Sequence, residues 1–252
     1  CADMSLDVQS LAAVRPARWL RRVPGRETFV WPETGSAEAV VKRMRGGDWR
    51  EAWHARLHGL APRSPGRREF DNLRALETQG FPVPHALAWW EAASGSAREA
   101  CSLVVMQHIP HARNLRERIE AEAQLDLLTW AMRVLELVVR LHEHGWYPRD
   151  LYLQHFLALE EPRRLVLLDV GRARQERRPR ERWFVKDLAA LAHSTPAGVP
   201  RFLRLRFLAG YLDGRRILAR RRRRAWARAI QARLLRMAQH SPRHGEGEAG
   251  RG

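Results

Sequence analysis

The spacing of apolar residues divides the chain into a strand-rich front and a helical back. Short runs rich in β-branched and aromatic residues predict strands at 27–31, 39–44, 86–90 and 102–107. Between the second and third of these strands, Phe70, Leu73 and Leu76 recur at every third position. This spacing predicts a helix over 67–79, which Gly80 ends.

The back half carries longer helical periods. Apolar residues that step by three and four predict a long helix over 123–144, closed by Gly145. A hairpin is expected at 156–170, and further helices are expected at 183–192, 201–212 and 216–237. This order of elements predicts a two-lobed α+β fold.

The same pattern predicts how the chain is divided. We expect a small β-rich amino-terminal lobe with one main helix, followed by a mostly helical carboxy-terminal lobe. The segments are an amino-terminal extension at 1–20, the two lobes at 21–109 and 110–237, and a disordered polar tail at 238–252.

Charge and composition narrow the class of protein. The chain has 252 residues, of which 45% are hydrophobic, so it can bury a sizeable core. No run of about 18 apolar residues predicts a membrane-spanning helix. The formal net charge of +17 favours an anionic partner such as a nucleic acid, an anionic membrane or a phosphorylated substrate. A nucleic-acid-binding function has no motif to support it beyond this charge.

The two cysteines, Cys1 and Cys101, exclude a disulfide scaffold and a cysteine-based metal site. Sparse cysteine is typical of a reducing compartment. No signal peptide is visible, and we expect a cytoplasmic protein.

Two acidic residues in the back half suggest phosphoryl transfer. Asp150 follows Arg149 in a loop, and Asp169 follows the aliphatic run Leu165–Leu168 just before Gly171. Phosphoryl transfer needs one carboxylate near the attacking hydroxyl and another on the Mg²⁺ that bridges the phosphates. The sequence therefore makes Asp150 a candidate catalytic carboxylate and Asp169 a candidate metal ligand. The alternatives are a surface helix cap for Asp150 and a turn cap for Asp169.

Lysine is rare in this chain, which makes both lysines informative. Lys42 and Lys186 stand among 45 basic residues that are otherwise arginine. Lys42 lies in the second predicted strand, where an ammonium could neutralise nucleotide phosphates. We expect Glu69 to be its ion-pair partner, with Glu77 as the alternative. Lys186 has the same rarity, but its place before Asp187 on a predicted helix also suits a structural role.

Four further residues are predicted to bind the nucleotide. Gly25 and Arg26 lie where a phosphate-covering loop would be, although no G-x-G-x-x-G motif is present. Backbone amides and the Arg26 guanidinium would cover the phosphates instead. Met106 and His108, at the end of the fourth predicted strand, complete the set.

The loop from Tyr147 to Leu157 resembles the catalytic loop of the Kdo/WaaP group of lipopolysaccharide kinases. These are bacterial sugar kinases with a protein-kinase-like fold. Three more segments agree with this family in order and spacing: the lysine strand at 39–44, the helix and its exit at 69–84, and the segment at 183–191. The resemblance extends over roughly 21–212, which is most of the chain.

The resemblance implies ATP-dependent phosphorylation of a sugar hydroxyl in the lipopolysaccharide inner core, on a heptose or on Kdo. It implies these roles: Asp150 as acid–base residue, Asp169 as Mg²⁺ ligand, Lys42 as nucleotide ligand with Glu69 as its partner, and Asp187 as support of the loop. It also places His155 where protein kinases have a metal-binding Asn, so His155 is a second candidate ligand of the metal.

Two departures from protein kinases are visible. Pro148 stands in place of the usual His before Arg149, and the turn from Asp169 to Arg172 is looser than the Asp-Phe-Gly of protein kinases. In addition, Tyr152 stands where many protein kinases have Lys, which argues against a typical Ser/Thr kinase. Both acids remain, which argues against a dead enzyme. Two alternatives stay open: a kinase-like enzyme with a protein or small-molecule acceptor, and a non-catalytic kinase-like scaffold.

The resemblance also implies a membrane-bound acceptor, the lipid A–core, at the cytoplasmic face of the inner membrane. Arg220–Arg224 with the apolar residues around it could form a basic amphipathic helix that docks on that anionic surface. The alternative, of equal weight, is a helix packed on the back lobe with its arginines in solvent.

Overall fold

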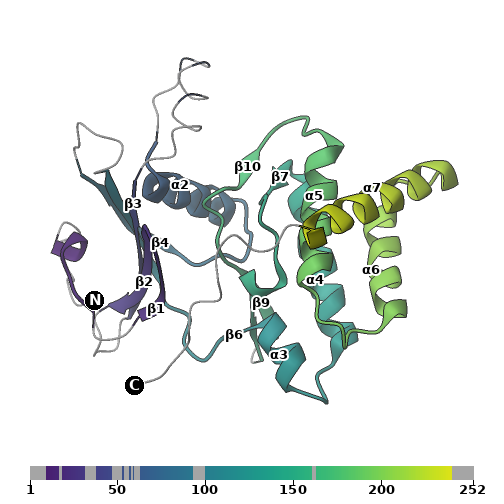
Figure 1. Cartoon of the computed structure of the whole chain (residues 1–252), viewed down its shortest axis with the longest axis horizontal. Helices are drawn as coiled ribbons and strands as arrows, with labels where there is room; N and C mark the ends of the chain where they lie inside the picture. Colours follow the sequence, from purple (N-terminus) through teal and green to yellow (C-terminus); the bar gives the residue numbers. More distant parts are fainter. Residues whose placement is uncertain are drawn as a thin grey trace. The chain divides into compact units, whose positions relative to one another are not determined.

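The computed structural model describes residues 10–16, 19–31, 38–46, 53, 57, 59, 63–92, 100–160 and 163–239. They form two compact units, and Figure 1 labels most of their helices and strands. The first unit holds the described residues up to Gln79 together with Pro84–Pro110. The second holds Gly80–Val83 and the described residues from His111 onward. The fold is mixed α and β, with an antiparallel sheet in the first unit and mainly helices in the second.

The first unit is a five-stranded antiparallel sheet with one helix against it. The strands, in the spatial order β1-β2-β3-β5-β4, are β1 (Trp19–Val23), β2 (Arg26–Trp31), β3 (Ala39–Arg45), β5 (Cys101–Gln107) and β4 (Ala86–Glu91). Helix α2 (Pro65–Thr78) packs against β4 and β5. The four predicted strands and the predicted helix are all present, within two residues at each end. Strand β1 was not predicted as a separate strand.

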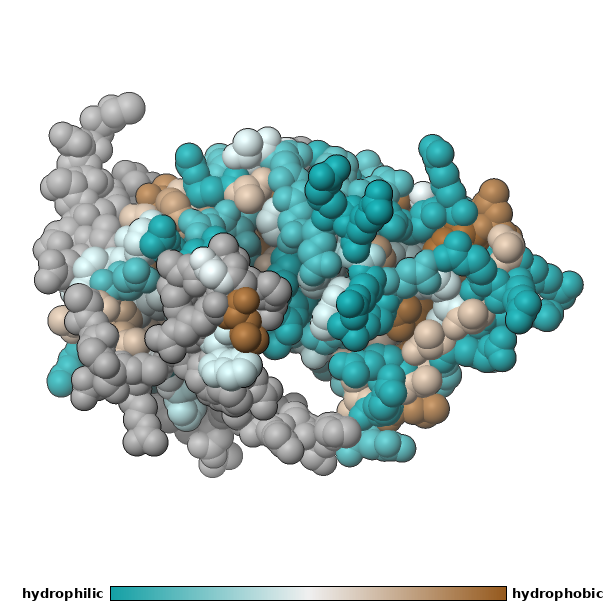
Figure 2. Space-filling model, turned by 90° about the horizontal axis from the view of Figure 1, so that it is seen from above, coloured by the Kyte–Doolittle hydropathy of each residue, from teal (hydrophilic) through white to brown (hydrophobic). Residues whose placement is uncertain are grey.

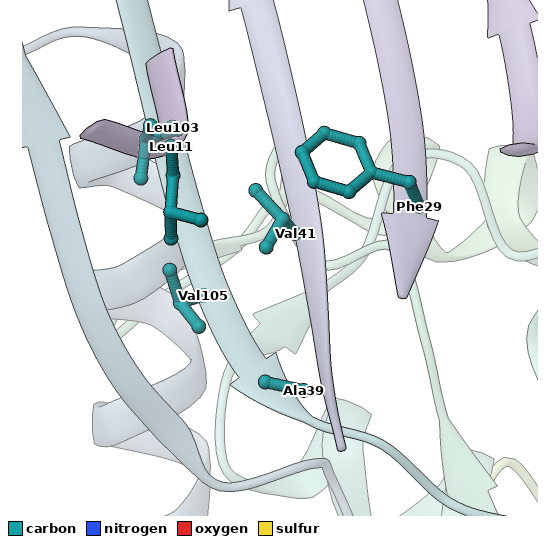
Figure 3. Packing of buried hydrophobic residues seen from close by; sticks show 6 residues of the cluster. All are labelled: Leu11, Phe29, Ala39, Val41, Leu103 and Val105. Atoms are coloured by element: carbon teal, nitrogen blue, oxygen red, sulfur yellow. The ribbon is translucent and has the colours of Figure 1, made fainter. Parts of the chain in front are cut away.

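The core on one face of this sheet includes a residue that precedes the predicted lobe. Figure 3 shows Phe29, Val41 and Leu103 packed with Leu11, which comes from the 3-10 helix Ser10–Ala12. The Arg43 guanidinium, 5% exposed, holds this segment by donating hydrogen bonds to the carbonyl oxygens of residues 11, 12 and 14. Residues 10–14 of the predicted amino-terminal extension therefore pack on the sheet.

The second unit is built from helices and three short antiparallel strand pairings. Its helices are α3 (Leu115–Ala121), α4 (Leu127–Glu143), α5 (Glu181–Ser194), α6 (Arg201–Gly214) and α7 (Arg220–Gln239), with a 3-10 turn at Leu153–His155. Its strands are β6 (Arg113–Asn114), β7 (Trp146–Tyr147), β8 (Phe156–Leu159), β9 (Arg164–Leu167) and β10 (Arg174–Gln175). The order β6-β8-β9 forms one sheet and β10-β7 forms the other.

Two helices of this unit begin four residues later than predicted. The prediction of one helix over 123–144 is wrong at its start, because α4 begins at Leu127, where the Asp126 carboxylate caps the backbone N–H of Thr129 at 3.0 Å. Helix α7 begins at Arg220 rather than at 216, since Arg216 has a φ of +54°. It continues to Gln239, so residues 238 and 239 are helical rather than disordered. The rest of the predicted tail lies outside the described residues.

Helix α7 (yellow in Figure 1) uses its apolar stripe inside the second unit. Trp226 and Ile230 are buried as α7 packs along α5, and the Trp226 ring lies 5.9 Å from that of Tyr211. Most arginines of the run 220–224 remain exposed. The prediction of a carboxy-terminal helix packed on the lobe with a solvated arginine face is therefore confirmed. Among the described residues, no helix combines the length and the hydropathy that crossing a membrane requires.

Candidate active site

A buried ion pair between Lys42 and Glu69 forms the centre of the first unit's candidate site. Side chains alternate along β3, so Lys42 points to the face opposite the Phe29 core, toward α2. There the Lys42 Nζ contacts the Glu69 Oε1, with Glu69 only 1% exposed. Arg26 adds a second cation, its Nη2 lying 3.9 Å from Glu69 Oε2. Burial of both partners makes the pair costly to break, because either charge alone would be left without compensation.

A glycine lets α2 approach the sheet closely enough for this pair to form. A Cβ at Gly66 would lie 2.7 Å from the Leu103 carbonyl oxygen, which is a severe overlap. The Gly66 N–H donates instead to the Ser102 Oγ at 3.1 Å. Glu77, the alternative partner of Lys42, lies at the other end of α2 and contacts His85. The structure thus pairs Lys42 with Glu69 rather than with Glu77.

The other predicted nucleotide-binding residues lie in the same unit. Gly25, with a φ of +76°, forms the tight turn between β1 and β2, and its carbonyl oxygen accepts from the Arg45 N–H at 2.8 Å. Met106 is buried near the end of β5. His108 is half-buried, and its Nδ1 lies 2.7 Å from the Glu38 carboxylate. Their role in nucleotide binding stays a prediction.

In the second unit, Asp150 lies in a loop held by several backbone contacts. The Asp150 carbonyl oxygen accepts from the Tyr152 N–H at 2.9 Å and from the His155 ring Nδ1 at 2.8 Å. The preceding residue, Arg149, has a φ of +72°, which is uncommon for a residue other than glycine. Non-glycine residues in this region cluster at functional sites.

Two cations contact the Asp150 carboxylate. The Arg172 Nη1 lies 3.0 and 3.3 Å from the two carboxylate oxygens, and the Lys186 Nζ lies 3.9 Å from Oδ1. Arg172 is an exposed residue two positions after Val170, whereas Lys186 is a half-buried residue of α5. Burial lowers the pKa of the Lys186 ammonium, and the Asp150 charge opposes that shift.

Asp169, the second predicted acid, follows β9 and lies beside His155. Its φ is +56°, and its Oδ2 lies 3.6 Å from the His155 Nε2. Because a carbonyl oxygen can only accept, the His155 Nδ1 that contacts Asp150 must carry a proton. In the neutral ring the Nε2 lone pair then faces the Asp169 carboxylate, and a cation between these two atoms would be stabilised.

Asp169 and His155 could together take part in holding a Mg²⁺ ion. Among the described residues, no group of three or more His, Cys, Asp and Glu side chains is placed to hold a metal. Mg²⁺ is usually bound by one or two carboxylates, with substrate phosphates and water completing the octahedron. One carboxylate with a neighbouring imidazole nitrogen is consistent with that pattern.

Behind the loop lies a fully buried polar cluster from three helices. Asp187 of α5 and His142 of α4 are both fully buried. The distance between the Asp187 Oδ2 and the His142 Nε2 is 3.6 Å. The His142 Nδ1 lies 2.7 Å from the Tyr211 hydroxyl of α6. Burial raises the pKa of the Asp187 carboxyl and lowers that of His142. The loop is tied to α5 by a hydrogen bond from the Leu153 N–H to the Ser194 Oγ at 2.7 Å.

The sequence did not predict that the side chains of Arg172 and Lys186 contact the Asp150 carboxylate. Arg172 could not be identified from the sequence, because it is one arginine of a basic loop and it is 22 residues away from Asp150 in the chain. Lys186 was singled out by its rarity, yet nothing in the sequence showed that it faces Asp150. The sequence did single out the two acids Asp150 and Asp169, together with His155 and Asp187. All four residues lie in the second unit.

Comparison with known proteins gives three results. The model of the lipopolysaccharide kinase (Kdo/WaaP) family matches residues 12–211. A lipopolysaccharide core heptose(I) kinase, WaaP of Pseudomonas aeruginosa, is 30% identical over 204 residues, covering 76% of this chain and 75% of that protein. A solved structure of WaaP in complex with acyl carrier protein matches with a TM-score of 0.63 and 26% identity, covering 92% of each chain.

Proposed function

This chain belongs to the lipopolysaccharide kinase (Kdo/WaaP) family, and on that basis we propose that it phosphorylates a sugar hydroxyl of the lipopolysaccharide inner core with ATP. A heptose is the favoured acceptor, because the relative at 30% identity is named a heptose(I) kinase. Kdo is the second candidate sugar. The observation that carries the proposal is the arrangement of Asp150 and Asp169 on either side of His155.

The residues would divide the work as follows. Lys42, held by Glu69, would bind nucleotide phosphates together with Arg26 and the Gly25 turn, while Met106 and His108 would contact the rest of the nucleotide. Asp150 would accept the proton of the attacking hydroxyl. Asp169 and His155 would hold Mg²⁺, which when bound neutralises charge on the phosphates. We assign 21–109 to the amino-terminal lobe and 110–237 to the carboxy-terminal lobe.

The first test is phosphate transfer by the purified chain from ATP to dephosphorylated lipopolysaccharide core in the presence of Mg²⁺. We expect transfer that depends on the core. The Asp169→Asn variant should lose on the order of 10²-fold or more of this rate, since metal binding supplies several kcal/mol of charge stabilisation. The control is Asp213→Asn, an exposed carboxylate on α6.

The outcomes separate the alternatives. ATP binding without transfer to the core would redirect the proposal to a protein or small-molecule acceptor. Folded protein that binds no nucleotide would instead be a kinase-like scaffold. Equal transfer by the wild type and by Asp169→Asn would remove Asp169 from the site.

An acyl carrier protein is a candidate partner. The WaaP structure contains one. In the second unit, helices α4, α5, α6 and α7 surround an apolar cavity of about 450 Å³, whose lining includes Val134, Leu191, Leu208 and Leu234. A cavity of this size and character suits an acyl chain. The transfer assay would therefore be made with and without added acyl carrier protein.

The basic surface of the second unit supports a location on the anionic inner-membrane face. Two arginine runs, 177–182 and 220–224, are joined where Arg222 contacts Glu181 at the start of α5. We call their exposed arginines the arginine surface: Arg177, Arg178, Arg180, Arg182, Arg220, Arg221, Arg222 and Arg224. In Figure 2, hydrophilic residues cover most of the described part of the visible face. Because α7 buries Trp226 and Ile230, attraction to lipid phosphates would be mainly electrostatic.

Replacing three of these arginines should weaken binding to anionic vesicles. The variant with Arg220, Arg221 and Arg224 changed to Gln should bind vesicles containing phosphatidylglycerol about 10²-fold less tightly, at roughly 1 kcal/mol per charge. Vesicle co-sedimentation measures this. The matched control changes three exposed arginines elsewhere, at 74, 133 and 164. Equal losses in both variants would show that only net charge matters and would remove the arginine surface as a docking site.

A further inference from the structure

Two cations lie beside the predicted catalytic carboxylate of Asp150, although one would be enough to neutralise it. Arg172 alone gives Asp150 a close ion pair, with its Nη1 at 3.0 Å from Oδ2. The Lys186 ammonium lies farther away, 3.9 Å from the other oxygen. One carboxylate flanked by two cations leaves a net charge of +1, which suits the binding of an additional anion beside Asp150.

The Lys186 side chain is held beside Asp150 by the helix that carries it, and most of it is shielded from solvent. Its side chain is 23% exposed, and it projects from α5 one residue before the fully buried Asp187. A helix anchored in the core fixes the position of the ammonium better than an exposed loop would. Arg172, with its side chain 56% exposed, lacks that support.

The residue type is also informative. The chain has 43 arginines and only two lysines, and the other lysine is the buried Lys42. A chain that uses arginine for nearly every surface charge retains lysine where a compact point charge is required. Burial lowers the pKa of Lys186, so placing this ammonium here costs free energy that a purely solvated charge would not.

The loop that carries Asp150 supplies no such cation itself. From Asp150 to His155 the only basic side chain is His155, which faces Asp169. Tyr152, two residues after Asp150, is half-buried, and its ring packs against His155 with the centroids 5.7 Å apart. A side-chain ammonium fixed beside Asp150 therefore comes from another element of the second unit, helix α5.

We propose that Lys186 is a catalytic residue that binds the oxygens of the phosphoryl group during its transfer, beside Asp150. This proposal rests on the proposed kinase function. In the step, the acceptor oxygen forms a bond to the γ-phosphorus, and the bond from that phosphorus to the β,γ-bridging oxygen breaks. ADP leaves with the electron pair, and the hydroxyl proton passes to Asp150. Charge spreads over the equatorial oxygens of the transferred group, where the ammonium stabilises it.

Lys186→Met should lower kcat about 10²–10³-fold, with the Kd of ATP changed less than about threefold. Lys186→Arg should recover part of the rate. His193→Gln, an exposed change near the other end of α5, is the matched control and should keep the full rate.

A second readout separates binding of the phosphoryl group from an effect on Asp150 or on folding. ADP with aluminium fluoride and Mg²⁺ imitates the transferred group without needing an acceptor. Lys186→Met should bind this complex about 10²-fold more weakly than wild type while binding ADP alone equally well. The same loss is expected when both proteins also carry Asp150→Asn.

If the loss disappears in the Asp150→Asn background, Lys186 acts through Asp150 and the proposal is overturned. An unchanged affinity for ADP–aluminium fluoride would overturn it as well. Failure of the proposed function is a different result, because wild-type protein would then transfer no phosphate to the core.

Discussion

Replacing Asp150 by Asn is expected to reduce kcat for phosphate transfer to the lipopolysaccharide core by roughly 10²–10⁴-fold. The amide keeps the size of the side chain but cannot accept the hydroxyl proton. Its oxygen can still accept a hydrogen bond from Arg172, so the loop should keep its conformation. The measurement is single-turnover transfer from radiolabelled ATP at saturating core.

Two measurements keep this result interpretable. The circular dichroism spectrum and the Kd of ATP should match those of wild type, because the nucleotide ligands predicted in the first unit are unchanged. Asp213→Asn again serves as the carboxylate control. A kcat within about threefold of wild type would assign Asp150 a purely structural role in its loop.

Gly145→Ala is expected to destabilise the second unit by about 2–4 kcal/mol. Gly145 has a φ of +77°, and a Cβ there would lie 2.1 Å from the Glu176 carbonyl oxygen. The Gly145 carbonyl also accepts from the Glu176 N–H at 3.1 Å, in the same place where β7 pairs with β10. A methyl group must therefore push apart the two strands that lead into and out of the catalytic segment.

Urea unfolding followed by circular dichroism measures this change. The matched control is Gly198→Ala, where no atom lies within 4 Å of the added carbon, and it should shift stability by less than about 1 kcal/mol. Transfer activity should fall in Gly145→Ala even at temperatures where the protein stays folded, since the loop begins two residues later. Equal urea midpoints for the two variants would contradict the steric argument.

The site of the first unit could be predicted because two regular periods determine it. Alternation along β3 places Lys42 on one face of the sheet, and helical periodicity places Glu69 on the same face of α2 as the buried Leu73 and Leu76. The sequence still left Glu77 as an alternative partner of Lys42, and the packing of α2 on the sheet decides for Glu69. The close approach that joins them depends on Gly66, whose role only the packing against Leu103 reveals.

The parts that could not be predicted depend on tertiary contacts or on very short elements. Strands β6, β7 and β10 have two residues each, too few to show a period. The segment around Leu11 is fixed by the distant Arg43. Helix α4 begins directly after Asp126, which caps it, and the apolar spacing of the sequence did not show this start. The two cations on Asp150 come from positions 22 and 36 residues later in the chain.

The backbone at Arg149 and Asp169 has a consequence for laboratory evolution. Both residues have positive φ, a conformation that costs about 1–2 kcal/mol for residues other than glycine. Glycine at either position would relieve that strain. Screens that score only the protein left soluble after heating would therefore select glycine at these two positions. Libraries selected for thermostability alone would then accumulate Asp169→Gly members that lack the proposed metal ligand, unless every round also selects for phosphate transfer.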